Sequence, residues 1–263
     1  RIVTEYAKKW RFSFNGKKSA IVAFGDKHFR RRVKSEKFAC TSSNVPVCDE
    51  YEYLGVIFQH DLKWKSHVEK ITTMARAASA QMAWYCRRGR GLRMRSAMQL
   101  WCSAVRPRLE YACELWSHSI TAEQEKEVER VQLSFIKKML GIPRGTASVF
   151  VWVESGVERI RARWDKLTIG FLKRAAAAEE GRLARDAVEV ALREGRGSPS
   201  SWGGKVARVL ESATESGLVG GVHSVEEVAT ALEDNELSID ERENRASQET
   251  ASQMPSTRGM LAA

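Results

Sequence analysis

The chain has 263 residues, room for one or two domains, and its apolar and charged fractions of 43% and 29% are those of ordinary globular proteins. No apolar run reaches the roughly 18–20 residues that span a bilayer, and no signal-peptide pattern follows Arg1. We therefore expect no membrane partner and an intracellular location, with nucleus and cytoplasm both left open. Five cysteines without a C-x-x-C pair argue against a disulfide framework or a structural zinc site.

The net charge of +10 is unevenly distributed. Residues 1–110 hold 23 Lys+Arg against 9 Asp+Glu, which gives +14, whereas the remainder holds 20 against 24, which gives −4. A charge run is usually only a solvated face, but a strongly basic half also attracts polyanions by counterion release. The arginines that we select as nucleic-acid contacts lie in two clusters: Arg30, Arg31 and Arg32, then Arg87, Arg88 and Arg90.

The first sixty residues predict short strands after an initial helix at 1–10. Trp10, Phe12 and Phe14 alternate with polar residues, which favours a strand, and Asn15-Gly16 is a strong turn signal. Gly25 stops the apolar run Ser19–Phe24, which suits a second strand. Further strands are expected at 38–40 and 52–58, with loop residues between them at 42–46.

Beyond His60 the apolar period becomes helical. We expect a long helix from Trp64 to Tyr85, with Trp84 beside its apolar stripe and exposed, and then a helical run interrupted by Pro107. Thr121 to Gln124 forms a capping box for a helix that ends at Gly141. The remaining expectations are a helical segment at 158–193, a linker-like stretch at 195–201, a short acidic helix at 224–236 and a disordered last twenty-five residues.

Several motifs occur in a characteristic order. They are Asn15-Gly16-Lys17-Lys18-Ser19, Tyr53-Leu54-Gly55-Val56, the segment 62–68, the segment 100–111 with Trp116 behind it, Gln132, and Leu140-Gly141-Ile142-Pro143-Arg144-Gly145-Thr146. Each is weak alone. In this order they resemble the end of the palm, the primer grip and the thumb of a reverse transcriptase from non-LTR (LINE-type) retrotransposons. The resemblance covers about residues 5–170.

The resemblance implies roles for individual residues. Lys18 matches the lysine near the phosphates of the incoming nucleotide, where an ammonium can stabilise or protonate the departing pyrophosphate. Tyr53, Leu54 and Gly55 match the primer grip, in which a glycine lets the protein backbone approach a nucleic-acid backbone. The plain alternatives are a solvated turn lysine and an ordinary half-buried strand with a glycine bulge. For the histidines, including His67, a packing or capping role is the better interpretation.

The fold class that this resemblance implies is α+β, with a small antiparallel sheet followed by helices. The predicted domains are residues 1–60 as the end of the palm, 61–145 as a helical thumb, 146–195 as a helical connection, and 196–263 as a linker, a short acidic helix and a disordered tail. The partners would be an RNA template and a DNA primer.

The catalytic aspartates of such a polymerase would precede Arg1, so we expect a fragment that binds primer and template but does not polymerise alone. Two-metal phosphoryl transfer needs carboxylates to hold magnesium, and no metal or other cofactor site is predicted in this chain. The open alternatives are a non-catalytic nucleic-acid-binding protein derived from such an element and a decayed reading frame.

Overall fold

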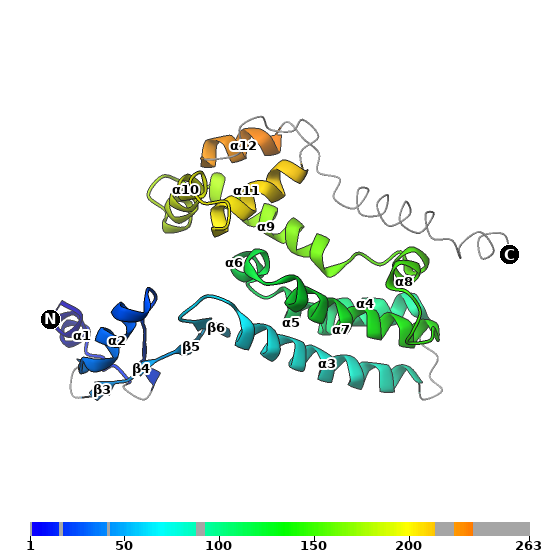
Figure 1. Ribbon diagram of the computed structural model, residues 1–263, viewed down its shortest axis with the longest axis horizontal. Coiled ribbons are helices and arrows are strands. Elements are labelled where there is room, and N and C mark those ends of the chain that lie inside the picture. Colours follow the sequence, from blue (N-terminus) through cyan, green and yellow to red (C-terminus); the bar gives the residue numbers. More distant parts are fainter. Residues whose placement is uncertain (1, 16–17, 41–42, 88–92, 214–223, 234–263) are drawn as a thin grey trace. The chain divides into compact units, whose positions relative to one another are not determined.

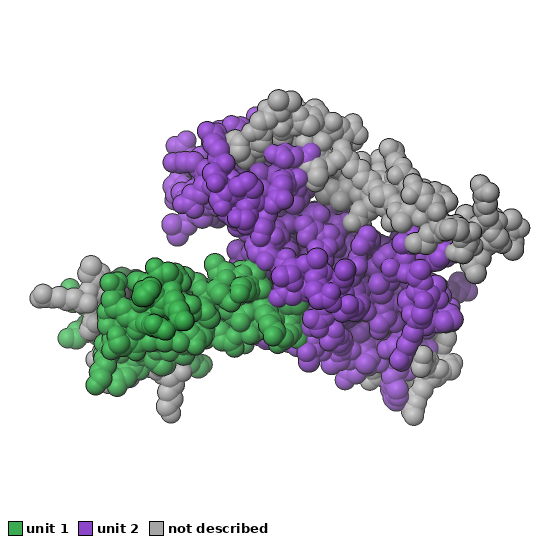
Figure 2. Space-filling model, viewed as in Figure 1, with its two compact units in different colours: residues 1–69 green, residues 70–263 purple. Residues whose placement is uncertain are grey.

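The computed structural model describes residues 2–15, 18–40, 43–87, 93–213 and 224–233. These residues are mostly helical, in agreement with the predicted α+β class (Figure 1). The predicted single antiparallel sheet is wrong, because the strands of the described residues form three separate two-stranded sheets, one of which is parallel. The chain divides into two compact units, residues 1–69 and residues 70–263 (Figure 2). The predicted boundaries at 60, 145 and 195 describe functional parts and stay predictions.

The first unit is built from short elements. The sheets pair β1 with β4 in parallel, and β2 with β3 and β5 with β6 antiparallel. The elements are α1 (Ile2–Lys9), β1 (Ile21–Val22), α2 (Lys27–Ser35), β2 (Phe38–Cys40), β3 (Ser43–Val45), β4 (Val47–Cys48), β5 (Glu50–Tyr53) and β6 (Val56–Gln59).

The predicted strand at Trp10–Phe14 is wrong. Trp10 and Phe12 instead donate backbone hydrogen bonds to the carbonyl oxygens of Tyr6 and Ala7, which close a turn at the end of α1. The alternating aromatics contact one another, with ring centroids of Phe12 and Phe14 at 5.3 Å. A strand needs a hydrogen-bonded neighbour, and alternation by itself does not supply one. One other strand prediction and one loop prediction also need correction. The expected strand Ser19–Phe24 is reduced to the two residues of β1, and the expected loop at 42–46 includes β3.

The second unit is helical. Helix α3 (Lys65–Arg87) begins in the first unit and continues into the second, as the apolar stripe predicts, with Val68, Ile71 and Ala75 buried. The later helices are α4 (Met94–Ala104), α5 (Arg106–Glu110), α6 (Cys113–Trp116), α7 (Ala122–Leu140), α8 (Ser148–Ser155), α9 (Ile160–Ala176), α10 (Leu183–Gly195), α11 (Trp202–Ala213) and α12 (Val225–Glu233), with a 3-10 turn η2 (Ser117–Ser119) before α7.

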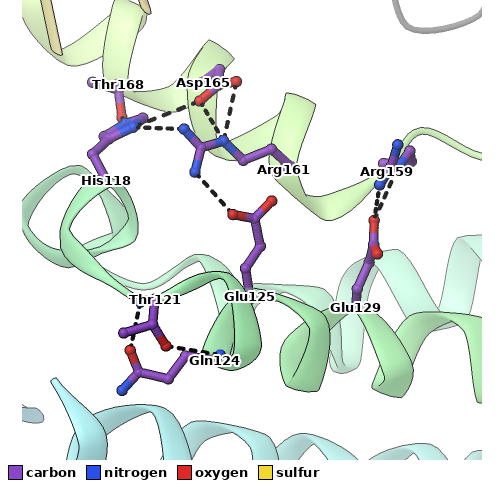
Figure 3. Close-up of polar contacts among 9 residues, drawn as sticks. All are labelled: His118, Thr121, Gln124, Glu125, Glu129, Arg159, Arg161, Asp165 and Thr168. Carbon is purple, nitrogen blue, oxygen red and sulfur yellow. Dashed lines mark hydrogen bonds and ion pairs between the residues drawn. The ribbon is translucent and has the colours of Figure 1, made fainter. Parts of the chain in front are cut away.

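Helix α7 has the ends that its sequence predicts. Thr121 Oγ1 accepts a hydrogen bond from the Gln124 backbone N–H, and Gln124 Oε1 accepts one from the Thr121 N–H (Figure 3). Gly141 ends the helix in the left-handed conformation at φ 68°. Pro107 interrupts the preceding run as expected, at a position in the first turn of α5 where its missing N–H is tolerated.

The glycine- and serine-rich stretch at 195–201 is a tight turn between two packed helices and not a linker. Helices α10 and α11 approach so closely that a Cβ on Gly203 would lie 1.9 Å from the carbonyl oxygen of Ala191. Val188, Leu192 and Leu210 of these helices are buried together with residues of α9 and α12. The glycines therefore serve close packing, which composition alone does not distinguish from chain flexibility.

Candidate nucleic-acid interface

Residues Tyr53–Val56 form the tip of a two-stranded hairpin and not the single strand expected at 52–58. Tyr53 pairs with Val56, so that Leu54 and Gly55 are the two loop residues. Both have positive φ, 48° for Leu54 and 86° for Gly55, as a type I′ turn requires. Tyr53 is 61% and Leu54 72% exposed. The hairpin thus presents two large apolar side chains at its tip.

The base of this hairpin is bonded to the start of helix α3. Ser66 donates its backbone N–H to Gln59 Oε1 at 3.0 Å and its hydroxyl to Glu50 Oε2 at 2.7 Å. The Ile57 N–H points at His67 Nδ1, 3.4 Å away, and buried His67 packs against the Trp64 ring, which confirms the packing role predicted for this histidine. Both strands are therefore bonded to the first turn of helix α3.

Lys18 lies beside the same hairpin. Its backbone N–H donates to the Asn15 carbonyl oxygen at 3.0 Å, and its own carbonyl oxygen accepts the Tyr51 hydroxyl proton. Tyr51 and Tyr53 are two residues apart on one strand and point to the same face of the hairpin. The exposed Lys18 therefore sits near the face that carries Tyr53. Its predicted role toward nucleotide phosphates stays a prediction.

The first arginine cluster lies on helix α2, which Asp26 caps by accepting the Phe29 N–H at 2.7 Å. Arg31 and Arg32 are exposed, with the Arg32 guanidinium 5.5 Å from the centre of the Phe29 ring, whereas Arg30 is half-buried. No residue of this helix is buried, so its charged surface, and not an apolar face, is its main feature.

The second arginine cluster lies largely outside the described residues: Arg88 and Arg90 are not among them, and only the backbone of Arg87 is. Trp84 on the same helix is 50% exposed, as predicted from its place beside the apolar stripe.

Two residues of the motifs, Gln132 and Trp116, have structural roles that the sequence did not reveal. The buried Gln132 side chain accepts the Ile160 N–H at 3.0 Å and donates to the Glu158 carbonyl oxygen at 2.7 Å, so it caps the start of α9 from helix α7. Trp116 Nε1 donates to the Tyr111 carbonyl oxygen at 3.1 Å, which closes the turn after the Pro107 segment. Both side chains therefore stabilise the packing of the second, helical unit.

Sequence reasoning also missed a partly buried ionic network between η2, α7 and α9. Arg161 Nη2 lies 3.2 Å from His118 Nδ1, Arg161 Nε lies 3.2 Å from Asp165 Oδ1, and Arg161 Nη1 lies 3.4 Å from Glu125 Oε2 (Figure 3). His118 Nε2 is 2.8 Å from Thr168 Oγ1. The only local signal is the four-residue spacing of Arg161 and Asp165.

Burial dominates the titration of this network. It lowers the pKa of His118 to about 3, an effect that Arg161 reinforces, so the imidazole is neutral at physiological pH. Burial also raises the pKa of Asp165 to about 6, although Arg161 opposes that rise. A neutral His118 can accept the Arg161 proton at Nδ1 and donate from Nε2 to Thr168, which fits the observed distances.

Two curated proteins match about half of the chain. It is 25% identical over 129 residues to a probable RNA-directed DNA polymerase from transposon X-element of Drosophila melanogaster, covering 49% of this chain and 13% of that protein. It is 24% identical over 140 residues to the RNA-directed DNA polymerase from mobile element jockey of Drosophila funebris, covering 53% and 15%. The chain is related to the reverse transcriptases of non-LTR retrotransposons.

The matched region spans about one-seventh of the length of these reverse transcriptases. No family model and no solved structure matches the chain. Within the described part of the chain, no three His, Cys, Asp or Glu side chains are grouped so that they could hold a metal ion. Nor is any helix there long and apolar enough to span a membrane.

Proposed function

We propose that this chain serves a non-LTR reverse transcriptase as its primer- and template-binding part, with the β5–β6 hairpin as primer grip and the helices of 61–145 as thumb. The supporting observation is the conformation of Leu54. A leucine at positive φ costs about 1–2 kcal/mol relative to a right-handed conformation, and a 72% exposed side chain regains little of that by burial. Backbone strain that is not offset by burial of the side chain points to a role in contact with a ligand.

The chemistry of the neighbouring residues fits a primer end. Exposed Tyr53 and Leu54 offer an aromatic ring and an aliphatic surface to a terminal base and sugar. Arg31 and Arg32 offer guanidinium groups to backbone phosphates, which they bind at two points each. Lys18, bonded through its backbone to the same hairpin, would meet the nucleotide phosphates. Magnesium would be held by other parts of the complete polymerase.

Salt-dependent binding tests this assignment. We expect the purified chain to bind an RNA–DNA hybrid, and the double variant Arg31→Gln/Arg32→Gln to reduce the slope of log affinity against log salt by about 0.9 for each lost phosphate contact. Lys173→Gln/Arg174→Gln on helix α9 makes the same change in net charge on exposed residues of another surface and is the control. Equal slopes for the two variants would contradict a phosphate-contact role for α2.

The alternative of a non-catalytic binding protein derived from such an element predicts the same binding. The two proposals differ in whether the hairpin is needed for primer extension. Primer extension by the chain alone is expected to be absent in both cases, whereas a polymerase that carries this hairpin within its full length should lose extension when Leu54 or Gly55 is changed. Full extension by such variants would favour the derived binding protein.

A further inference from the structure

Four basic side chains converge on a groove at the end of helix α7, far along the sequence from the hairpin. The groove has a volume of about 850 Å³, and Arg130, Lys137 and Lys138 of α7 line it together with Arg144 of the following turn. None of its lining residues is acidic. This groove lies in the half of the sequence whose net charge is −4, so overall composition does not predict it.

Two of the four basic residues have partners, and one of these, Lys137, holds the turn against the helix. Lys137 Nζ donates to the carbonyl oxygens of Arg144 at 2.8 Å and Thr146 at 2.6 Å, which pins the turn onto the helix. Arg130 Nη2 pairs with exposed Glu123 at 2.9 Å. For Lys138 and Arg144, the described residues provide no acidic partner within ion-pair distance. The groove therefore carries two positive charges that no acidic side chain among the described residues neutralises.

The floor of the groove is apolar. Leu133 and Ile142 line it, and both pack against the buried cluster of Ile136, Val151 and Trp152. The Ile142 N–H also donates to the Lys137 carbonyl oxygen at 2.9 Å. Aliphatic groups on the floor and cations on the walls match a ligand with apolar faces and regularly spaced negative charges.

We propose that this groove binds a single strand of nucleic acid, with Lys138 and Arg144 on its phosphates and Leu133 and Ile142 beneath its sugars or bases. The inference rests on the proposed function and adds to it a second binding site, distinct from the hairpin. A duplex buries its base faces and presents mainly phosphates and sugars to such a surface, whereas an unpaired strand also offers base faces that can rest on an apolar floor. The positive charges of the groove therefore favour a polyanion, and its apolar floor favours a nucleic-acid strand with unpaired bases.

The experiment compares three full-length proteins: wild type, Lys138→Gln/Arg144→Gln, and the control Lys173→Gln/Arg174→Gln. Lys137 stays unchanged because it holds the turn, and equal melting temperatures establish that all three are folded. Binding to single-stranded RNA, single-stranded DNA and an RNA–DNA hybrid of equal length is measured across salt concentrations. We expect the groove variant to lower the single-strand slope by about 1.4, since each contact contributes about 0.7, while the control and the hybrid slope stay near wild type.

Each other outcome counts against the inference in a recognisable way. An unchanged single-strand slope in the groove variant would overturn it, and the proposed function would stand if Arg31→Gln/Arg32→Gln still weakens hybrid binding. An equal loss for hybrid and single strand would show a general phosphate patch and refute the single-strand assignment. Displacement of the strand by polyglutamate as effectively as by unlabelled RNA would indicate an acidic peptide site. Absence of binding by the wild type would remove both proposals.

Discussion

Replacing Leu54 with asparagine separates the backbone strain of the hairpin turn from its surface chemistry. Leu54 has φ 48°, and a left-handed conformation costs an ordinary residue about 1–2 kcal/mol, whereas asparagine adopts it readily because its side chain forms local hydrogen bonds. Asn-Gly is also the preferred pair for a type I′ turn. We therefore expect Leu54→Asn to raise the free energy of unfolding by roughly 0.5–1 kcal/mol, about half of the strain.

The same substitution should weaken binding to a primer–template. Fully burying a leucine side chain is worth about 1.5–3 kcal/mol, and Leu54 has 72% of its surface left to bury, so the contact is worth about 1–2 kcal/mol. The dissociation constant should rise about 5- to 30-fold. Urea unfolding and titration of a labelled hybrid measure the two effects. Leu183→Asn, at a residue 86% exposed on helix α10, is the control.

The specific result expected for Leu54→Asn is a higher free energy of unfolding together with weaker binding to the hybrid. A Leu54→Asn protein that binds as wild type would refute the primer-grip assignment, because the exposed side chain would then have no ligand. A protein that loses both stability and binding would refute the strain argument, since relief of a left-handed leucine cannot destabilise the turn.

Three further predictions rest on other parts of the chain. Gly55→Val should destabilise the first unit by about 1–2 kcal/mol in urea unfolding, because valine is strained at φ 86°. Any effect of this substitution on function must therefore be corrected for the loss of stability. An unchanged free energy of unfolding would contradict the turn geometry. Gln132→Ala should lower the free energy of unfolding by about 1–3 kcal/mol, because it leaves the Ile160 N–H and the Glu158 carbonyl oxygen without their hydrogen-bond partner. The control Gln99→Ala, at an exposed residue, should change it by no more than about 0.5 kcal/mol. Asp165→Asn should make the free energy of unfolding rise more steeply with pH between pH 4 and 6, by up to about 1.4 kcal/mol per pH unit. An unchanged pH profile would count against the ionic network of His118, Arg161 and Asp165.

The sign of that pH effect follows from two opposing groups. Asp165 has a folded-state pKa raised to about 6, so the stability it contributes is complete at low pH and is lost as the pH rises through 6. His118 has a pKa lowered to about 3, so its contribution is present above 6.5 and is lost as the pH falls toward 3. Between pH 4 and 6 the two slopes nearly cancel, and Asp165→Asn leaves only that of His118.

Local rules determined much of the helical half from the sequence alone. The stripe from Trp64 placed helix α3, and the capping box at Thr121 with Gly141 beyond it placed both ends of α7. These signals succeed because the residues that form a helix or its cap lie within four positions of one another, so the chain carries the whole interaction locally.

Tertiary structure decided the features that need distant partners. Trp10–Phe14 alternates like a strand but has no strand to pair with, and Tyr53–Val56 is a hairpin tip because its flanking residues pair with each other and are bonded to Ser66. The ionic network joins His118 to residues 43 and 50 positions away. The basic groove depends on the hydrogen bonds by which Lys137 of α7 holds the turn at 141–146 against the helix. Hydrogen bonds and charges of this kind depend on distance in space, which a sequence period does not encode.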